Sequence, residues 1–229
     1  MAHQLANSKQ CVLVLSENWE STNGSMYLFD SNAGAGLWNQ HGLPMRVVLG
    51  KNGLANGIGM IPLQLEQAPQ KKEGDNRAPA GIFQLSSAFG YAEKRNARWV
   101  KLPYLAVSDQ TEGIDDPASR YYNRLIDRAK VKRVDWQSAE KMRRPDNLYE
   151  WGIVVDHNPA AIPGAGSCIF LHIWKDARTP TTGCTAMAEE NLLQLLRWLD
   201  PSLRPILVQM PRDIYQALAA KFDLPMGFN

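Results

Sequence analysis

Short apolar runs separated by turn residues make up most of the chain. They have the length of β-strands and are bounded by Gly, Asn and Pro. The predicted strands are Cys11–Leu15, Ser25–Phe29, Met45–Leu49, Ile82–Leu85, Trp99–Val107, Trp151–Asp156, Ser167–Trp174 and Ile206–Met210. Asn23-Gly24, between the first two runs, is typical of a hairpin turn. Many short strands and few helices predict a mainly β fold, an antiparallel sandwich or a barrel-like sheet.

A helical period follows Met187. Thr185 suits the N-cap position and Asp200-Pro201 ends the pattern. The apolar face recurs at i, i+3, i+4 and i+7 and consists of Leu192, Leu195, Leu196 and Leu199. We expect this helix, the strand at Ile206–Met210 and a last helix to form a C-terminal tail.

Residues 109–150 break the strand pattern, being polar and locally basic. Between Arg120 and Arg144 there are nine Lys or Arg residues against three acidic ones. We expect an inserted helical or irregular segment. Arg120, Arg124 and Arg128 recur every four residues and would form a ridge on one helix face. The segment is either a solvated surface helix or a lid that places cations over a site.

Cys184 would then precede a helix N-terminus, where the dipole favours a thiolate. The dipole contributes about 0.3–1 kcal/mol, less than one pKa unit, so a second group must activate the thiol. His172, near the end of an apolar strand, can take the thiol proton. The alternative is a core histidine beside a small buried thiol. A zinc site of Cys168, His172, Cys184 and His157 lacks any C-x-x-C or H-x₃-H spacing, so no metal is expected.

The segment Thr181-Thr182-Gly183-Cys184, preceded by His172, resembles the catalytic motif of YkuD-type L,D-transpeptidases, a histidine followed by Ser/Thr-x-Gly-Cys. Residues 74–83 (GDNRAPAGIF) and 47–50 (VVLG) are similar to other conserved stretches of that family. The resemblance spans residues 45–190. Two positions depart from the family pattern: Ala186 stands where many members carry Arg or Asn, and Ala78 replaces a threonine.

The resemblance implies a YkuD-type fold in which Cys184 attacks a peptidoglycan stem peptide and His172 accepts its proton. Gly183 and Cys184 would offer backbone N–H groups to the oxyanion, and a carbonyl of residues 181–183 would orient His172. Thr181, Thr182 and Trp174 would border the substrate, while Arg143 or Arg144 would replace the missing carboxylate contact. The products would be those of an L,D-transpeptidase, or of an L,D-carboxypeptidase or endopeptidase. A non-catalytic wall-binding module is the rival hypothesis. Neither a metal nor an organic cofactor is required.

Length and composition fit a single domain over residues 1–229. The chain is 45% hydrophobic, and its net charge of +2 gives no reason to expect a nucleic-acid partner. No run approaches eighteen apolar residues, so no membrane span is expected. The N-terminus does not resemble a signal peptide. Resemblance to a cell-wall family nevertheless favours a periplasmic or envelope location with the leader removed. Three cysteines leave at least one unpaired.

Overall fold

A computed structural model describes residues 5, 7–31, 37–65 and 67–227. The strands are β1 (Gln10–Ser16), β2 (Asn23–Asp30), β3 (Asn39–Val48), β4 (Leu54–Asn56), β5 (Ala78–Gly90), β6 (Tyr104–Ala106), β7 (Thr111–Gly113), β8 (Leu125–Asp127), β9 (Glu140–Lys141), β10 (Trp151–Val155), β11 (Phe170–Ile173), β12 (Thr185–Met187) and β13 (Ile206–Pro211). The α-helices are α1 (Glu189–Trp198) and α2 (Arg212–Leu218), and the 3₁₀ turns are η2 (Arg128–Lys130), η3 (Pro201–Leu203) and η4 (Ala220–Phe222).

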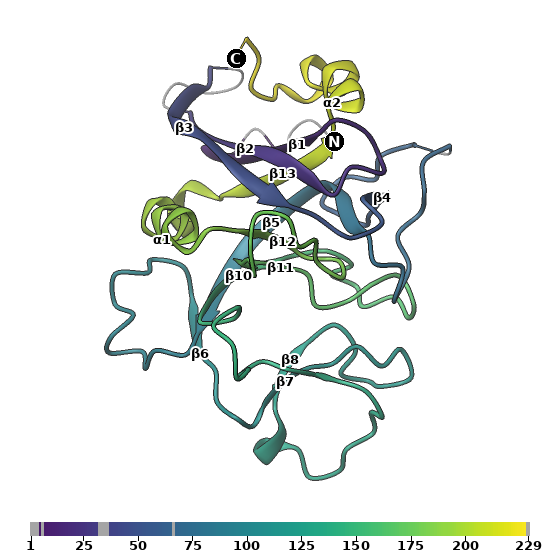
Figure 1. The fold of residues 1–229 in the computed structure, drawn as a ribbon, viewed down its shortest axis with the longest axis vertical. Helices are drawn as coiled ribbons and strands as arrows, with labels where there is room; N and C mark the ends of the chain where they lie inside the picture. Colours follow the sequence, from purple (N-terminus) through teal and green to yellow (C-terminus); the bar gives the residue numbers. More distant parts are fainter. Residues whose placement is uncertain (1–4, 6, 32–36, 66, 228–229) are drawn as a thin grey trace.

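Eight strands close into a barrel (Figure 1). Their order is β10-β11-β12-β3-β2-β1-β13-β5, and β5 pairs back onto β10. The prediction of a mainly β, barrel-like fold is confirmed. Purely antiparallel pairing is wrong, because β1 pairs in parallel with β13 and β11 in parallel with β12. The short β4 and β6 extend the sheet by pairing with β5.

The predicted C-terminal helix–strand–helix tail is confirmed. The apolar face of α1 buries Leu192, Leu195 and Leu196. This helix lies against the side of the barrel, β13 forms part of the wall between β1 and β5, and α2 lies at the end that carries the C-terminus (Figure 1). All seven residues of β1 are buried, since neighbouring strands and helices cover both of its faces.

Two local predictions about the strands are wrong. Asn23 and Gly24 belong to β2, where Gly24 pairs with Ser16, and the connection from β1 lies in residues 17–22. A Cβ at Gly24 would lie 2.6 Å from the Leu15 carbonyl oxygen, so this glycine permits close strand approach instead of a turn. In the predicted strand Trp99–Val107 only β6 is extended, because Trp99 packs its ring on Trp151 at 5.0 Å instead of pairing.

Residues 109–150 form a small three-stranded sheet, β8-β7-β9, that lies below the barrel (Figure 1). All of this segment is described, and it contains no α-helix, so the predicted arginine ridge does not exist. Arg120 pairs with Asp135, and Arg128 starts the turn η2. Asn123 has a φ of 60°, a left-handed conformation that a continuous helix does not allow.

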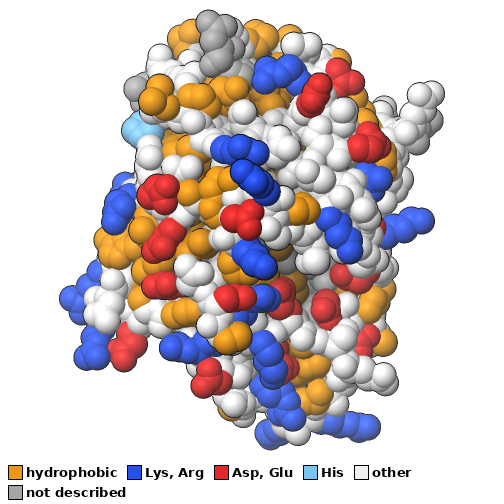
Figure 2. Space-filling view, in the orientation of Figure 1, with side chains coloured by type: hydrophobic (Ala, Val, Ile, Leu, Met, Phe, Trp, Pro, Cys, Tyr) orange, Lys and Arg blue, Asp and Glu red, His pale blue; other side chains and the backbone are white. Residues whose placement is uncertain are grey.

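Basic and acidic side chains are interspersed on the face seen in Figure 2, over the barrel as well as the small sheet. No single-sign field dominates this face, in agreement with the small net charge. None of the helices in the described ranges is long and apolar enough to cross a membrane.

Candidate active site

A second apolar cluster joins the barrel to the small sheet, and Cys184 belongs to it. Its buried members are Phe89, Val107, Met142, Tyr149, Phe170 and Cys184. The main core of the barrel lies elsewhere. The thiol is therefore placed where the barrel and the segment 109–150 meet, and both contribute side chains to its surroundings.

Cys184 does not lie at a helix start, so that prediction is wrong. The next three residues form β12, which is buried and pairs with β11 on one side and β3 on the other. The helix α1 begins only at Glu189, after Ala188 as its N-cap. Because the dipole effect falls off within the first turn of a helix, α1 cannot be what activates this thiol.

Cys184 and His172 lie on the same face of neighbouring strands. β11 and β12 are parallel, with His172 opposite Ala186. Cys184 is two residues before Ala186, and side chains two positions apart point to the same side. The Phe170 N–H, two residues before His172, donates to the Cys184 Sγ at 3.3 Å. Both side chains line one cavity of about 210 Å³.

Both groups are uncharged at neutral pH. Burial, together with the smaller effect of the Glu140 carboxylate, raises the pKa of the Cys184 thiol to about 12. Burial also lowers the pKa of His172 to about 4. The thiol donates to the Cys168 carbonyl at 3.7 Å, and within the described part of the chain it forms no hydrogen bond to the imidazole. The unliganded protein therefore holds a neutral thiol beside a neutral imidazole and contains no preformed thiolate–imidazolium pair.

The orientation of His172 is set by its own strand. Its Nδ1 lies 2.7 Å from the Ile173 carbonyl oxygen, which only accepts hydrogen bonds. Nδ1 therefore carries the proton, and Nε2 keeps the lone pair that a base requires. The expectation that residues 181–183 supply the orienting carbonyl is wrong. The Tyr149 ring packs edge-on against the imidazole at 5.0 Å between centroids.

The turn before Cys184 is fixed by Thr181. Its Oγ1 accepts from the Gly183 N–H at 3.1 Å and donates to the Cys184 carbonyl at 2.6 Å. Gly183 has a φ of 155°, which L side chains rarely adopt. The Thr181 backbone also bonds to Leu49 and Lys51 of the barrel. Thr181 thus holds the turn, although it lines the cavity as predicted.

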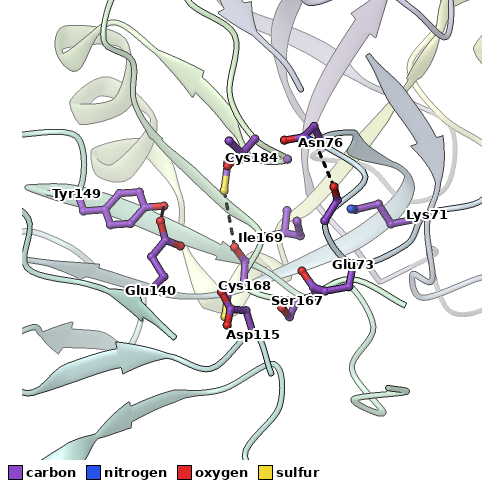
Figure 3. A pocket seen from close by; sticks show the side chains of 13 residues that line it. Lys71, Glu73, Asn76, Asp115, Glu140, Tyr149, Ser167, Cys168, Ile169 and Cys184 are labelled. Atoms are coloured by element: carbon purple, nitrogen blue, oxygen red, sulfur yellow. Dashed lines mark hydrogen bonds between the residues drawn. The ribbon is translucent and has the colours of Figure 1, made fainter. Parts of the chain in front are cut away.

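Two cavities meet at Cys184. The cavity of about 210 Å³ contains His172, and a second one of about 310 Å³ extends beneath the thiol (Figure 3). Cys184, Tyr149, Glu140 and Thr182 line both. The first also carries the cations Arg144 and Lys175; the second carries Lys71, Glu73, Asn76, Asp115, Ser167 and Gly183. A group bound in either cavity therefore reaches the same sulfur atom.

The structure separates the two arginines proposed as anchors. Arg144 lines the cavity of His172 together with Trp174 and Ala186, so it lies where the sequence lacks the cationic side chain of the family pattern. Asp146 holds its guanidinium with two hydrogen bonds, of 2.9 and 3.0 Å. Arg143 lines neither cavity; it packs over the Tyr91 ring.

Several residues of the site carry no sequence signal. Glu73 accepts hydrogen bonds from Tyr122 and Ser167, and the buried Lys71 pairs with Asp75. These polar residues lie singly in loops, where no periodicity or motif marks them. Only the folded chain brings them to Cys184.

His157, the weaker candidate for the base, is buried away from both cavities. Its Nε2 lies 2.9 Å from the Ala165 carbonyl oxygen, and burial lowers its pKa to about 4. All three cysteines are free thiols, and Cys11 is a core residue of β1. Among the described residues, no three His, Cys, Asp or Glu side chains are grouped to hold a metal ion.

Comparisons with known proteins do not establish a family. No protein-family model matches the chain, and no curated protein matches it. A search of solved structures finds a similarity to the helical cell shape determining protein Pgp2 from Campylobacter jejuni, with 12% sequence identity and a TM-score of 0.35. The match covers 92% of this chain and 53% of that one, so the chain spans about half its length. The resemblance to L,D-transpeptidases stays a prediction.

Proposed function

We propose that the protein is a cysteine-dependent acyltransferase that acts on peptidoglycan stem peptides, an L,D-transpeptidase. The observation that carries the proposal is the shared cavity of Cys184 and His172, whose side chains point from adjacent parallel strands to the same side. The imidazole is neutral and held as the Nδ1–H tautomer. A thiol and a fixed base in one cavity are the parts that nucleophilic acyl transfer requires.

The reaction begins with the uncharged pair. As Sγ bonds to the carbonyl carbon of an L-to-D peptide bond, its proton passes to Nε2 of His172. The Cys184 N–H, which has no partner among the turn and loop hydrogen bonds of the described residues, donates to the oxyanion. Collapse breaks the C–N bond, and the imidazolium returns its proton to the leaving amine. The remaining thioester is then attacked by an acceptor amine, which regenerates the thiol.

The charges of the two cavities support transfer between two substrates. The cavity with Arg144 and Lys175 suits a substrate carboxylate, because both side chains are cationic. The cavity with Glu73, Asp115 and Glu140 suits an approaching amine. Each substrate then reaches Cys184 from its own side.

Incubation with purified muropeptides, followed by mass analysis, tests the proposal. Cross-linked or amino-acid-exchanged products are expected. Cys184→Ala should lower the rate by about 10⁴-fold or more, and His172→Gln by a similar factor, because the two act as one unit. The exposed His41→Gln on β3 is the matched control and should retain the wild-type rate. Full activity of Cys184→Ala would end the proposal.

Two other functions give different outcomes in the same assay. Shortened stem peptides without exchange products indicate a hydrolase, in which water attacks the thioester. The wall-binding module is favoured by one observation, the burial of a thiol whose pKa is raised. That function predicts muropeptide binding of equal affinity in the wild type and in Cys184→Ala, with no product from either.

A further inference from the structure

A tyrosine hydroxyl links a partly exposed carboxyl group to the surroundings of the thiol. The Tyr149 hydroxyl donates to Glu140 Oε1 at 2.7 Å, and the two side chains face each other beside Cys184 (Figure 3). Tyr149, Glu140 and Cys184 line both cavities, and Tyr149 packs in one apolar cluster with Cys184. The tyrosine lowers the thiol pKa against the larger effect of burial. Glu140 comes from β9 of the small sheet and Cys184 from the barrel, so Tyr149 bridges the two parts.

Tyr149 is held in place for this contact. Its ring is 4% exposed and packs edge-on against Phe89, Phe170 and His172. The Arg144 guanidinium lies over the other part of the ring, 5.2 Å from its centroid. The hydroxyl therefore cannot leave the space between the carboxyl group and the sulfur, and both neighbours compete for it.

A phenol has one hydrogen to donate. While Glu140 is ionised it competes with the sulfur for that hydrogen, so the hydroxyl stabilises a thiolate only in part. When Glu140 is protonated, its own O–H can donate to the tyrosine oxygen. The phenol hydrogen is then available to a thiolate, and hydrogen bonds to a charged form stabilise that form.

We propose that Tyr149 is a further catalytic residue, whose hydroxyl donates to the negative charge that develops on Cys184, and that Glu140 is a positioning residue that controls the direction of this hydrogen bond. The inference rests on the proposed role of Cys184 as the nucleophile. No group is oxidised or reduced, and the only transfer within the relay is the shift of hydrogen bonds along Glu140, Tyr149 and Cys184.

Other charged groups face Glu140, Tyr149 and Cys184 and influence how the reactivity of the thiol depends on pH. Burial raises the pKa of Glu140, while the Tyr149 hydrogen bond and Arg144, 3.6 Å from Oε1, lower it. The groups around the relay are Asp115 from the loop after β7, Arg144 and Asp146 from the loop after β9, His172 from β11, Cys168 before β11 and Lys71 before β5.

Alkylation of Cys184 by iodoacetamide, measured across pH by peptide mass analysis, tests the relay without any substrate. Tyr149→Phe keeps the ring and removes the hydroxyl. We expect it to raise the thiol pKa and to slow labelling at pH 8.5 about tenfold, the loss of one hydrogen bond to a charged group. Tyr104→Phe, which removes a hydroxyl bonded to Ala92 far from the cavities, is the matched control and should leave labelling unchanged.

Glu140→Gln should act in the opposite direction. The neutral amide can donate to the tyrosine oxygen, so the phenol hydrogen turns to the sulfur and labelling becomes about tenfold faster. Asp156→Asn is the control, since Asp156 is another partly exposed carboxyl group with a raised pKa, bonded to Ser86 away from the cavities. Removing the charge of Glu140 also acts directly on the thiol, so the double variant Glu140→Gln/Tyr149→Phe is required.

In the double variant most of the acceleration should disappear, because its path through the hydroxyl is gone. If Glu140→Gln accelerated labelling equally with and without the Tyr149 hydroxyl, the relay would be overturned. The same holds if Tyr149→Phe folds normally by near-ultraviolet circular dichroism and is labelled at the wild-type rate. These outcomes are independent of turnover. A relay that behaves as expected in a protein that does not process muropeptides would refute the proposed function alone.

Discussion

Burial sets the protonation of both reacting side chains. It holds Cys184 as a thiol and His172 as a neutral imidazole, whose pKa values lie at about 12 and about 4. A preformed thiolate–imidazolium pair would need these values in the reverse order. In the proposed reaction the thiol becomes reactive only when a substrate carbonyl and a donor for the oxyanion are in place. Its neutral, buried state protects it from adventitious alkylation and oxidation.

The adjacent residues Arg144 and Arg143 differ in their position relative to the cavities, since only Arg144 lines the cavity of His172. Arg144→Gln should raise KM for a carboxylate-bearing stem peptide about tenfold with a smaller effect on kcat, because the lost contact binds substrate and transition state alike. Arg143→Gln, whose parent side chain lines neither cavity, should leave both constants unchanged. Steady-state kinetics on one muropeptide measures both variants. An equal rise in KM for the two would show general charge attraction instead of a specific contact.

The sequence could identify Cys184, His172 and Gly183, because they lie in one short segment whose spacing is recognisable. It could not identify Tyr149 or Glu140. These come from the segment 109–150, and only the packing of β9 and of the turn before β10 onto the barrel brings them to the thiol. Contacts of this kind depend on tertiary structure and leave no local pattern.

At the scale of elements, pairing overrides local propensity at β12. The sequence favours Thr185 as the N-cap of a helix, yet residues 185–187 form a strand because β11 and β3 satisfy their backbone groups on both sides. The long apolar runs, in contrast, form strands at the predicted places, since burial on both faces admits few alternatives. The segment 109–150 has weak apolar patterning, and its small sheet could not be predicted.

Asn123 docks the small sheet onto the barrel. Its Nδ2 donates to the carbonyl oxygens of His157 and Asn158, and its Oδ1 accepts from the Cys168 N–H, each at 2.9 Å. Asn123→Ala removes these bonds and leaves an alanine at positive φ, so we expect a loss of about 2–4 kcal/mol in the free energy of unfolding. Urea denaturation measures it. The exposed Asn96→Ala should change stability by less than about 0.5 kcal/mol.

For the whole molecule, closure of the barrel places the site. The pairing of β5 with β10 removes an open edge of the sheet. The small sheet, which precedes β10 in the chain, lies on the side where β11 and the start of β12 place His172 and Cys184. A rigid ring thus fixes the proposed base and nucleophile, while the attached segment supplies Tyr149, Glu140 and Arg144. The Tyr149 hydroxyl and the Glu140 carboxyl group of the attached segment can therefore change the pKa of the Cys184 thiol, which the barrel holds.

Two buried histidines make the whole fold sensitive to acid. The pKa of His157 and of His172 lies at about 4 in the folded protein, lowered by burial from 6.5. Between these values the unfolded chain binds more protons than the folded one, so stability is lost as the pH falls from 6.5 towards 4. The loss should reach about 2 kcal/mol per histidine between pH 7 and pH 5.

Urea denaturation at pH 7 and pH 5 checks this dependence. His157→Gln should remove about half of the loss, whereas the exposed His41→Gln should retain all of it. Burial raises the pKa of Glu140 and Asp156, so these carboxyl groups act in the opposite sense and stabilise the folded state as the pH falls. The difference between variants therefore isolates the histidine contribution better than the absolute slope. An unchanged slope in His157→Gln would show that folding does not lower the pKa of this imidazole.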